Sequence, residues 1–434
     1  MILKFIPITL CFYTLCSFAQ IADIERVNVN SNGDEATGGD SQSTDISGDG
    51  NLVAFSSSAT NLVENDSNLN SDIFVFDRNL NTISRVSVAS DGSQANGQSN
   101  SPRISRDGRF VAFRSAATNL VANDDNGRDD VFVHDLMTGT TELVSLSSLD
   151  NQSANSALLN DISADGSRVV FNADFSDASD TTPGQFDVWV RDLNSDTTLL
   201  VSQSSDGAVA NERARSAAIN STGELVVFLS EADNLIASDT NGLDDVFLRN
   251  LTTNETTRVS LTPNGEQLET GVSNSSTIGG ISDDGRFVAF QMSSNDLLDP
   301  MPSVLRNRII RHDRQTGANL FVSVENANSI SLSPSMSGDG NVVTYNSPGS
   351  FLSTEAEVFA RIISDNTTVL VSQNLMNEEG DDSSSLGVVS DNGQFITFIS
   401  VATNLVDDDM NDRDDVFVAE LSMPEDLIFS NGFD

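Results

Sequence analysis

The sequence predicts an all-β protein, a seven-bladed β-propeller built from four-stranded antiparallel blades. Three observations support this fold class. A motif of the form I-S-x-D-G occurs seven times along the 434 residues, at intervals of 53 to 62 residues. Each copy is followed by two short runs rich in Val, Ile and Phe, which are typical of buried strands. The last copy lacks its final strand, and a matching segment stands before the first copy instead.

Each repeat is predicted to supply four strands in the same order. The first precedes the Asp-Gly pair, as in SPRIS, and the second follows it, as in RFVAF. The third comes later, as in DVFVHD, and a short polar turn leads to the fourth, as in ELVSL. Asp-Gly pairs such as Asp107-Gly108 are hairpin signals. The seven motifs begin at Ile46, Ile104, Ile162, Ile219, Ile281, Met336 and Val389.

The ends of the repeat region indicate how the ring closes. The seventh repeat ends in DVFVAEL with no strand after it, and ERVNV at residues 25–29 matches the missing one. The loop that follows, NVNSNGDEATG, aligns with SVASDGSQANG at residues 87–97. An incomplete blade would leave an unpaired edge. We therefore expect the N-terminal strand to complete the last blade, beside residues 415–421.

The domain boundaries follow from the two ends of the chain. Residues 1–19, MILKFIPITLCFYTLCSFA, combine one lysine with an apolar run and small residues before Gln20, the pattern of a signal peptide. A retained membrane anchor is the alternative. Residues 20–421 form the propeller and residues 422–434 a tail. Cys11 and Cys16 both fall in the signal peptide, so the mature chain would contain no disulfide. The protein is expected to be periplasmic or extracellular, without a membrane span after cleavage.

The charge of the chain limits its partners. It has 64 acidic and 22 basic residues, a formal net charge of −42. Such a surface repels nucleic acid, because phosphate contacts need Lys and Arg. It attracts cations instead. We expect a monomer whose partner is a protein or a glycan.

The repeat pattern ISxDGRFVAF, DVFVxDL and RVS resembles the TolB-like, or PD40, β-propeller repeat of secreted and periplasmic bacterial proteins, a WD40-like repeat. The resemblance extends over residues 25–421. It implies the propeller fold and export but little about activity, because propellers host unrelated functions. TolB itself resembles a six-bladed propeller with an additional α/β domain, and the seven repeats here depart from that pattern.

Four repeats carry an acidic loop before the third strand, with the spacing D-x-N-x-x-x-D. Alternate Asp and Asn side chains on a turning loop can converge on Ca²⁺, which prefers six to eight oxygen ligands. The loops lack a distal bidentate Glu, so any Ca²⁺ site would be weak. The alternative is that Asp, Asn and Gly only shape the turn. Ca²⁺ is the one cofactor expected, and its candidate ligands are Asp66, Asn68, Asn70, Asp72, Asp124, Asn126, Asp130, Asp239, Asn241, Asp245, Asp409, Asn411 and Asp415.

The sequence shows no recognisable catalytic constellation. His134 and His312 occupy equivalent strand positions, filled elsewhere by Phe76, Arg191 or Arg249, so they are interpreted as blade-surface residues and not as bases. The sequence therefore favours a non-catalytic exported propeller that binds a protein or glycan through the long loops after the second and fourth strands. The alternative is a polysaccharide- or peptide-directed hydrolase or lyase that uses loop carboxylates.

Overall fold

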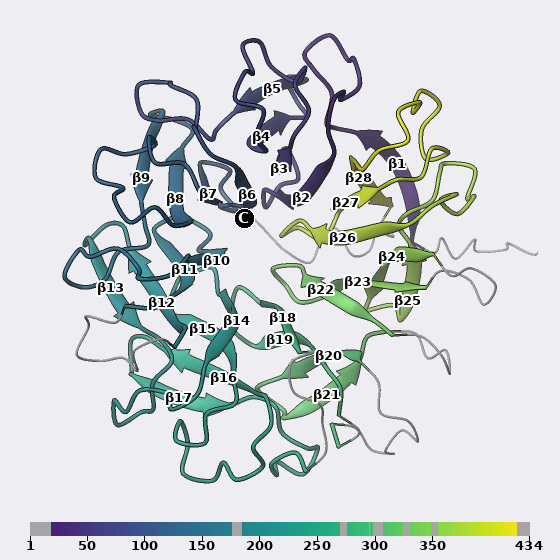
Figure 1. The fold of residues 1–434 in the computed structure, drawn as a ribbon. Coiled ribbons are helices and arrows are strands. Elements are labelled where there is room, and N and C mark those ends of the chain that lie inside the picture. The colour runs from purple at the N-terminus through teal and green to yellow at the C-terminus, as the bar shows by residue number, and fades with distance from the viewer. Residues whose placement is uncertain are drawn as a thin grey trace, which may run out of the picture.

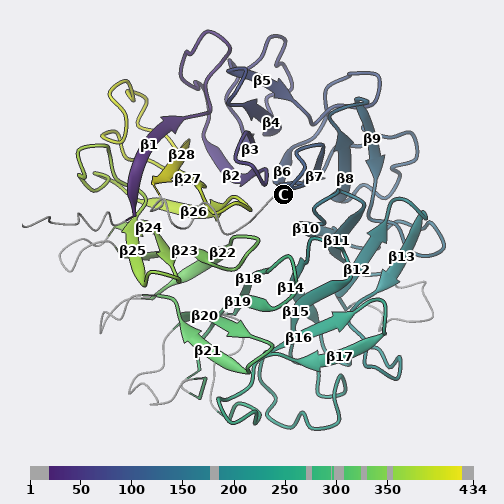
Figure 2. The ribbon, with the colours of Figure 1, turned by 180° about the vertical axis from the view of Figure 1, so that it is seen from behind.

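The computed structural model describes residues 19–175, 185–269, 276–294, 296–297, 307–323, 330–348 and 355–422. These residues form seven sheets of four antiparallel strands each, arranged as the blades of a ring (Figure 1 and, from behind, Figure 2). The predicted seven-bladed propeller is confirmed. None of the described residues belongs to a helix long and apolar enough to cross a bilayer. Of the predicted signal peptide (residues 1–19) and tail (residues 422–434), residues 1–18 and 423–434 lie outside the described residues.

The first four blades follow one another along the chain, each running from the centre of the ring outwards. Blade 1 comprises β2 (Ser41–Ile46), β3 (Leu52–Ser57), β4 (Asp72–Asp77) and β5 (Thr82–Arg85). Blade 2 comprises β6 (Ser99–Ile104), β7 (Phe110–Ser115), β8 (Asp130–Asp135) and β9 (Thr140–Leu143). Blade 3 comprises β10 (Leu158–Ile162), β11 (Arg168–Ala173), β12 (Asp187–Asp192) and β13 (Thr197–Leu200). Blade 4 comprises β14 (Ala214–Ile219), β15 (Leu225–Ser230), β16 (Asp245–Asn250) and β17 (Glu255–Arg258).

The last three blades complete the ring. Blade 5 comprises β18 (Thr277–Ile281), β19 (Phe287–Met292), β20 (Arg308–Asp313) and β21 (Ala318–Phe321). Blade 6 comprises β22 (Leu332–Met336), β23 (Val342–Pro348), β24 (Ala356–Ile362) and β25 (Thr367–Leu370). Blade 7 comprises β26 (Ser384–Val389), β27 (Phe395–Ser400), β28 (Asp415–Ser422) and, on its outer edge, β1 (Gln20–Arg26).

The core consists of apolar layers between neighbouring blades. The two middle strands of a blade are buried on both faces, which explains why their sequences are apolar without alternation. A pair of aromatic rings crosses each of several blades: in blade 2, Phe113 and Phe132 stack with centroids 5.9 Å apart. Trp189 in blade 3 has the position of Phe132, and Tyr345 in blade 6 has the position of Phe113. They are 3% and 1% exposed.

The Ser-x-Asp-Gly turns join the first and second strands. In blade 2, the Ser105 hydroxyl donates to Asp107 and accepts the backbone N–H of Phe110. Asp107 also accepts the N–H of Arg109 (3.0 Å). Gly108 has φ of +73°, a conformation that favours glycine. The sequence motif is therefore a turn held by its own side chains.

The outermost strand ends earlier than predicted, because a side chain replaces a backbone hydrogen bond. In blade 1, β5 ends at Arg85, and the hydroxyl of Ser87 accepts the backbone N–H of Ile73 (3.1 Å). The same hydroxyl donates to the carboxylate of Asp72 (2.6 Å). The RVS pattern of the fourth strand is thus partly a strand and partly a side-chain link to the third strand.

The ring closes as the repeat count requires. β1 pairs antiparallel with β28, with Arg26 opposite Phe417 and Gln20 opposite Ser422. This edge is visible in Figure 1, where the purple β1 lies beside the yellow β28. The predicted closure is confirmed, although the strand covers residues 20–26 and begins before the predicted segment 25–29.

Candidate functional site

The four acidic loops lie at equivalent places, each leading into the third strand of its blade. The last aspartate of each loop is completely buried, at 0% exposure. Each of these carboxylates accepts a hydrogen bond from the side chain that follows the outer strand. The four pairs are Asp72 with Ser87, Asp130 with Ser145, Asp245 with Ser260 and Asp415 with Asn28. These aspartates therefore have a structural role in joining the two outer strands.

An arginine of the outermost strand lies between the two aspartates in three of the loops. In blade 1, Arg85 Nη1 is 3.3 Å from Asp66 and 3.7 Å from Asp72. In blade 4, Arg258 Nη1 is 3.6 Å from Asp239 and 3.0 Å from Asp245. The guanidinium supplies the positive charge that a bound cation would otherwise supply.

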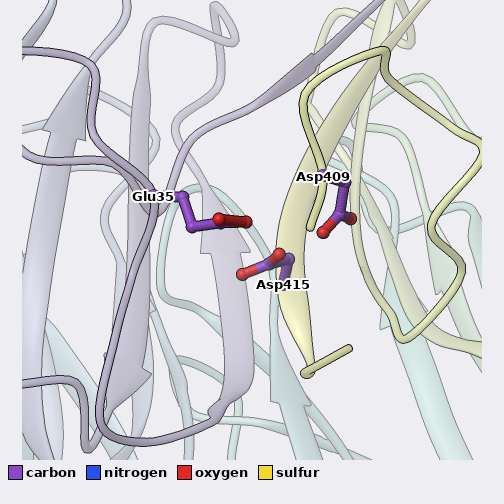
Figure 3. Close-up of side chains that lie close together, drawn as sticks. All are labelled: Glu35, Asp409 and Asp415. Atoms are coloured by element: carbon purple, nitrogen blue, oxygen red, sulfur yellow. The ribbon is translucent and has the colours of Figure 1, made fainter. Parts of the chain in front are cut away.

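Blade 7 repeats this arrangement with a third carboxylate. Glu35, Asp409 and Asp415 turn their carboxylates toward one another (Figure 3), and one oxygen from each lies within 4.8 Å of the others, a spacing that could hold a metal ion. Arg26 Nη1 lies 3.2 Å from Glu35, 3.3 Å from Asp409 and 3.6 Å from Asp415. Burial raises the pKa of Asp415 to about 6, and Asp409 adds to the shift while Arg26 opposes it. The guanidinium occupies the centre of this cluster, so it is a weak candidate for a metal site.

The asparagines of the D-x-N-x-x-x-D pattern stabilise the turn. The side-chain oxygen of Asn68 accepts the N–H of Asn70 (2.9 Å), and its amide donates to Asp72 (3.0 Å). Asn241 and Asn411 make the corresponding bonds in blades 4 and 7. The oxygen is thus already engaged by the backbone, which fits the turn interpretation of these residues.

The sequence analysis missed the arginines that lie beside these loops, although the strands that carry them differ visibly from blade to blade. The fourth-strand segments read SRVSV, TRVSL and ERVNV where the arginine is present, but ELVSL in blade 2. Arg85, Arg258 and Arg26 each stand opposite the central Phe of the third strand, and Leu143 has that register position in blade 2. Comparing the loops with the strands that follow them would have shown this pairing.

The histidines are buried between strands. His134 is 6% exposed, and its Nδ1 lies 2.8 Å from the Thr141 hydroxyl. His312 is 5% exposed and contacts Asn319 in the same way (2.7 Å). Burial lowers the pKa of both rings. The positions are interior, not surface as predicted, and both rings are engaged by neighbouring polar side chains.

The innermost strands line an axial channel, which the sequence analysis did not single out. A cavity of about 260 Å³ lies there. One residue from each blade, at the same strand register, contributes to its wall. This ring consists of Asp45, Arg103, Asp161, Ala218, Gly280, Ser335 and Val388. The charged members all come from blades 1 to 3.

Asp45 and Asp161 flank Arg103 in this channel wall. Burial raises the pKa of Asp45 to about 6, with Arg103 opposing the shift and Asp161 adding to it. Burial also raises the pKa of Asp161. Each carboxylate accepts a backbone N–H from the next blade, Asp45 that of Ile104 (2.8 Å) and Asp161 that of Ile219 (2.9 Å). Two half-buried carboxyl groups and a half-buried guanidinium therefore lie on three successive blades in the same channel wall.

A second charged group spans the channel at the turn end. Arg106, from the turn of blade 2, pairs with Asp391 of blade 7 and lies 3.4 Å from Asp283 of blade 5. Because these residues come from blades far apart in the ring, the arginine crosses the axis at this end.

The fold and this channel define a seven-bladed β-propeller with a charged axial site. No protein-family model matches the chain, and no curated protein matches it in sequence. The chain is similar to the β-propeller domain of the Trilobed protease from Pyrococcus furiosus, with a TM-score of 0.54 and 12% identity over 92% of this chain and 99% of that one. It is similar to oligogalacturonate lyase in complex with manganese, with a TM-score of 0.53 and 11% identity over 94% and 96%.

TolB from Acinetobacter baumannii is a more distant structural neighbour, with a TM-score of 0.42 and 12% identity over 88% of this chain and 79% of that one. This likeness is too low to carry an argument. Resemblance to the TolB-like repeat therefore extends to the propeller fold, and membership of that family stays a prediction.

The comparisons contradict the prediction of a non-catalytic protein. A lyase and the propeller domain of a protease share this architecture over more than nine tenths of the chain. At 11 and 12% identity they establish a shared fold and not a shared reaction. Histidine-centred sites were excluded from the sequence, and no pair of carboxylates stood out among its 64 acidic residues.

Proposed function

We propose that this chain is an exported enzyme that cleaves a glycan, a hydrolase or lyase whose reaction takes place in the axial channel. The observation that carries this proposal is the position of Asp45, Arg103 and Asp161, which lie at the same strand register on three successive blades and line one axial cavity. Glycan cleavage commonly uses two carboxyl groups, one as a proton donor and one as a base. A carboxyl group whose pKa is raised by burial is suited to the role of proton donor.

Burial raises the pKa of both carboxyl groups, and we assign Asp45 as the proton donor and Asp161 as the base. Asp45, with a pKa raised to about 6, keeps its proton further toward neutral pH than an ordinary aspartic acid and would protonate the leaving oxygen. Asp161 would accept the proton of the attacking water or of the sugar carbon. Arg103 would stabilise the negative charge that develops between them.

Several features support a glycan over a peptide. A serine or cysteine protease needs a nucleophile activated by a His partner, whereas paired aspartates can cleave peptides as well as glycans. The described residues contain no cysteine, and both histidines are buried within blades 2 and 5, away from the channel wall. One structural neighbour is named for its action on oligogalacturonate. The signal-peptide pattern of residues 1–19 supports export, and the acidic surface supports a glycan or protein partner.

The test compares glycan cleavage by the wild-type chain and two isosteric variants. Asp45→Asn and Asp161→Asn keep an oxygen that accepts the N–H of Ile104 or Ile219, so the blades stay linked. Both variants should lose at least about 100-fold in rate, the usual contribution of a positioned acid or base. Asp91→Asn, an exposed turn residue, is the matched control.

Reducing ends should be measured on a panel of neutral and acidic oligosaccharides, together with the ultraviolet absorbance of an unsaturated product. New reducing ends without absorbance indicate a hydrolase, and absorbance indicates a lyase. Failure to cleave any glycan, or full activity in both variants, would contradict the proposal. Cleavage of peptides alone would contradict the substrate class.

A further inference from the structure

We infer that the acidic loop of blade 2, residues 123–130, binds a calcium ion between Asp124 and Asp130, at the place where three other blades carry an internal arginine. The inference concerns the outer part of one blade and is independent of the function proposed for the axial channel. It rests on one difference between equivalent loops and on the buried oxygens that this difference leaves.

The difference is the residue opposite the central phenylalanine of the third strand. Arg85, Arg258 and Arg26 stand opposite Phe74, Phe247 and Phe417. In blade 2 the residue opposite Phe132 is Leu143, which is half-buried and uncharged. Asp124 and Asp130 keep the positions of the aspartate pairs elsewhere, so blade 2 retains both negative charges without the positive one.

The two carboxylates of blade 2 are buried and mostly without partners. Asp124 is 6% exposed and Asp130 is 0% exposed. Both oxygens of Asp124 and Oδ2 of Asp130 accept no hydrogen bond, while Oδ1 of Asp130 accepts the Ser145 hydroxyl (2.5 Å). Burial and repulsion from Asp130 raise the pKa of Asp124 to about 6. Three buried oxygens therefore lack a positive partner.

The other loops show what such a pair needs. Asp239 and Asp409 also have oxygens that accept no hydrogen bond, but an arginine nitrogen lies 3.6 Å and 3.3 Å from them. In blade 1, the Gln94 amide donates to both aspartates, at 2.8 and 3.1 Å. The corresponding amide in blade 2, that of Gln152, donates instead to the carbonyl of Asn123 (2.9 Å). The Gln152 amide also opposes the rise in the pKa of Asp124, but it carries no charge.

The chemistry of the site fits calcium. Calcium is bound by carboxylate and carbonyl oxygens in flexible geometry, and a divalent charge balances two aspartates. Magnesium requires near-ideal octahedral geometry and loses its water with difficulty, so a buried pair of carboxylates, which leaves little room for that water, favours calcium. Burying a carboxylate without a positive partner costs free energy of folding. A bound calcium ion would remove this cost, so the folded chain should bind it.

The test is the number of calcium ions bound per chain, measured by titration calorimetry in excess magnesium and salt. The wild-type chain should bind one ion, not four, and calcium should raise its melting temperature above that in magnesium. Leu143→Arg restores the arginine found in the other three loops, so both effects should be lost, while the melting temperature in chelator should rise. Thr140→Arg adds the same charge at an exposed position of the same strand and should bind calcium as the wild type does.

A second variant tests the same site in case Leu143→Arg does not fold. Asp124→Asn keeps the size of the side chain and removes one negative charge, so it should also lose the calcium site. The inference is overturned if the wild-type chain binds no calcium in excess magnesium. It is equally overturned if both variants keep the wild-type stoichiometry, or if several ions bind with similar affinity.

Discussion

Glu357 is a carboxyl group that is buried in blade 6 without an arginine at the position that other blades use. Glu357 of blade 6 stands where blades 1 to 4 have an aspartate bound to a serine, and the Ser372 hydroxyl donates to it. Leu370 occupies the register position of the arginines, and Glu357 is 0% exposed. Burial raises its pKa to about 7, with the Ser372 bond opposing and Glu379 adding to the shift.

This shift makes stability depend on pH. Between the unfolded pKa of 4.5 and about 7, the folded chain holds the Glu357 proton more tightly than the unfolded chain. The stabilisation is therefore complete below that window and is lost as pH rises through it. From about pH 5 to pH 8 the wild-type chain should lose roughly 2 to 3 kcal/mol of unfolding free energy more than Glu357→Gln.

Urea unfolding at several pH values measures this difference. Glu378→Gln, at an exposed carboxyl in the following loop, should behave as the wild type does. Parallel pH profiles of the wild type and Glu357→Gln would show that Glu357 is ionised or protonated equally in both states.

At the scale of the element, one serine hydroxyl links the two outer strands of a blade because it makes two hydrogen bonds. Ser87 is completely buried, accepts the N–H of Ile73 and donates to Asp72. Equivalent serines serve blades 2, 3, 4 and 6. The outer strand can therefore be only four residues long and still be held along the third strand.

Ser87→Ala should destabilise the protein by about 2 kcal/mol, because it leaves a buried N–H and a buried carboxylate each short of a partner. Denaturant unfolding measures the loss. Ser93→Ala, at an exposed turn position of the same blade, should stay within about 0.5 kcal/mol of the wild type. Equal stability of the two variants would argue that water replaces the hydroxyl.

The elements could be predicted because each repeat carries the same local signals. Turn residues such as Asp107-Gly108 and apolar runs such as RFVAF depend on neighbouring residues alone. The channel could not be predicted in this way, since Asp45, Arg103 and Asp161 are about 58 residues apart and meet only because the blades share a register. The arginines were missed for a similar reason. An acidic loop alone suggests a metal site, and the arginine that neutralises it lies on the outer strand, in a different part of the sequence.

At the scale of the whole molecule, the closure of the ring depends on its first strand. β1 covers the outer edge of β28, and Val27 donates its N–H to Val416 (2.8 Å). A chain that starts at residue 40 lacks this edge and Arg26, and it exposes a face of the last blade. It should melt well below a chain that starts at residue 19. Calorimetry measures both, and equal melting temperatures would show that the last blade is stable without its fourth strand.

The net charge of −42 should make stability depend on salt of any kind. Repulsion between surface carboxylates is screened as the Debye length falls from about 10 Å at 0.1 M to about 3 Å at 1 M. The melting temperature should therefore rise with sodium chloride and level off, in the wild type and in Leu143→Arg alike. A salt response that disappears in Leu143→Arg would assign it to the blade 2 loop instead of to the surface as a whole.

The pairing of β1 with β28 also sets an order of events during synthesis. Asn28 accepts the N–H of Val416 through its side chain, across 388 residues of chain. β1 is synthesised long before its partner β28. Each of the six intervening blades consists of consecutive strands and can pair from local sequence alone. Contacts of such long range form late and slowly in folding. A chain whose synthesis stops before residue 415 lacks β28, so its ring cannot close, and ring closure marks the point at which β28 has been made.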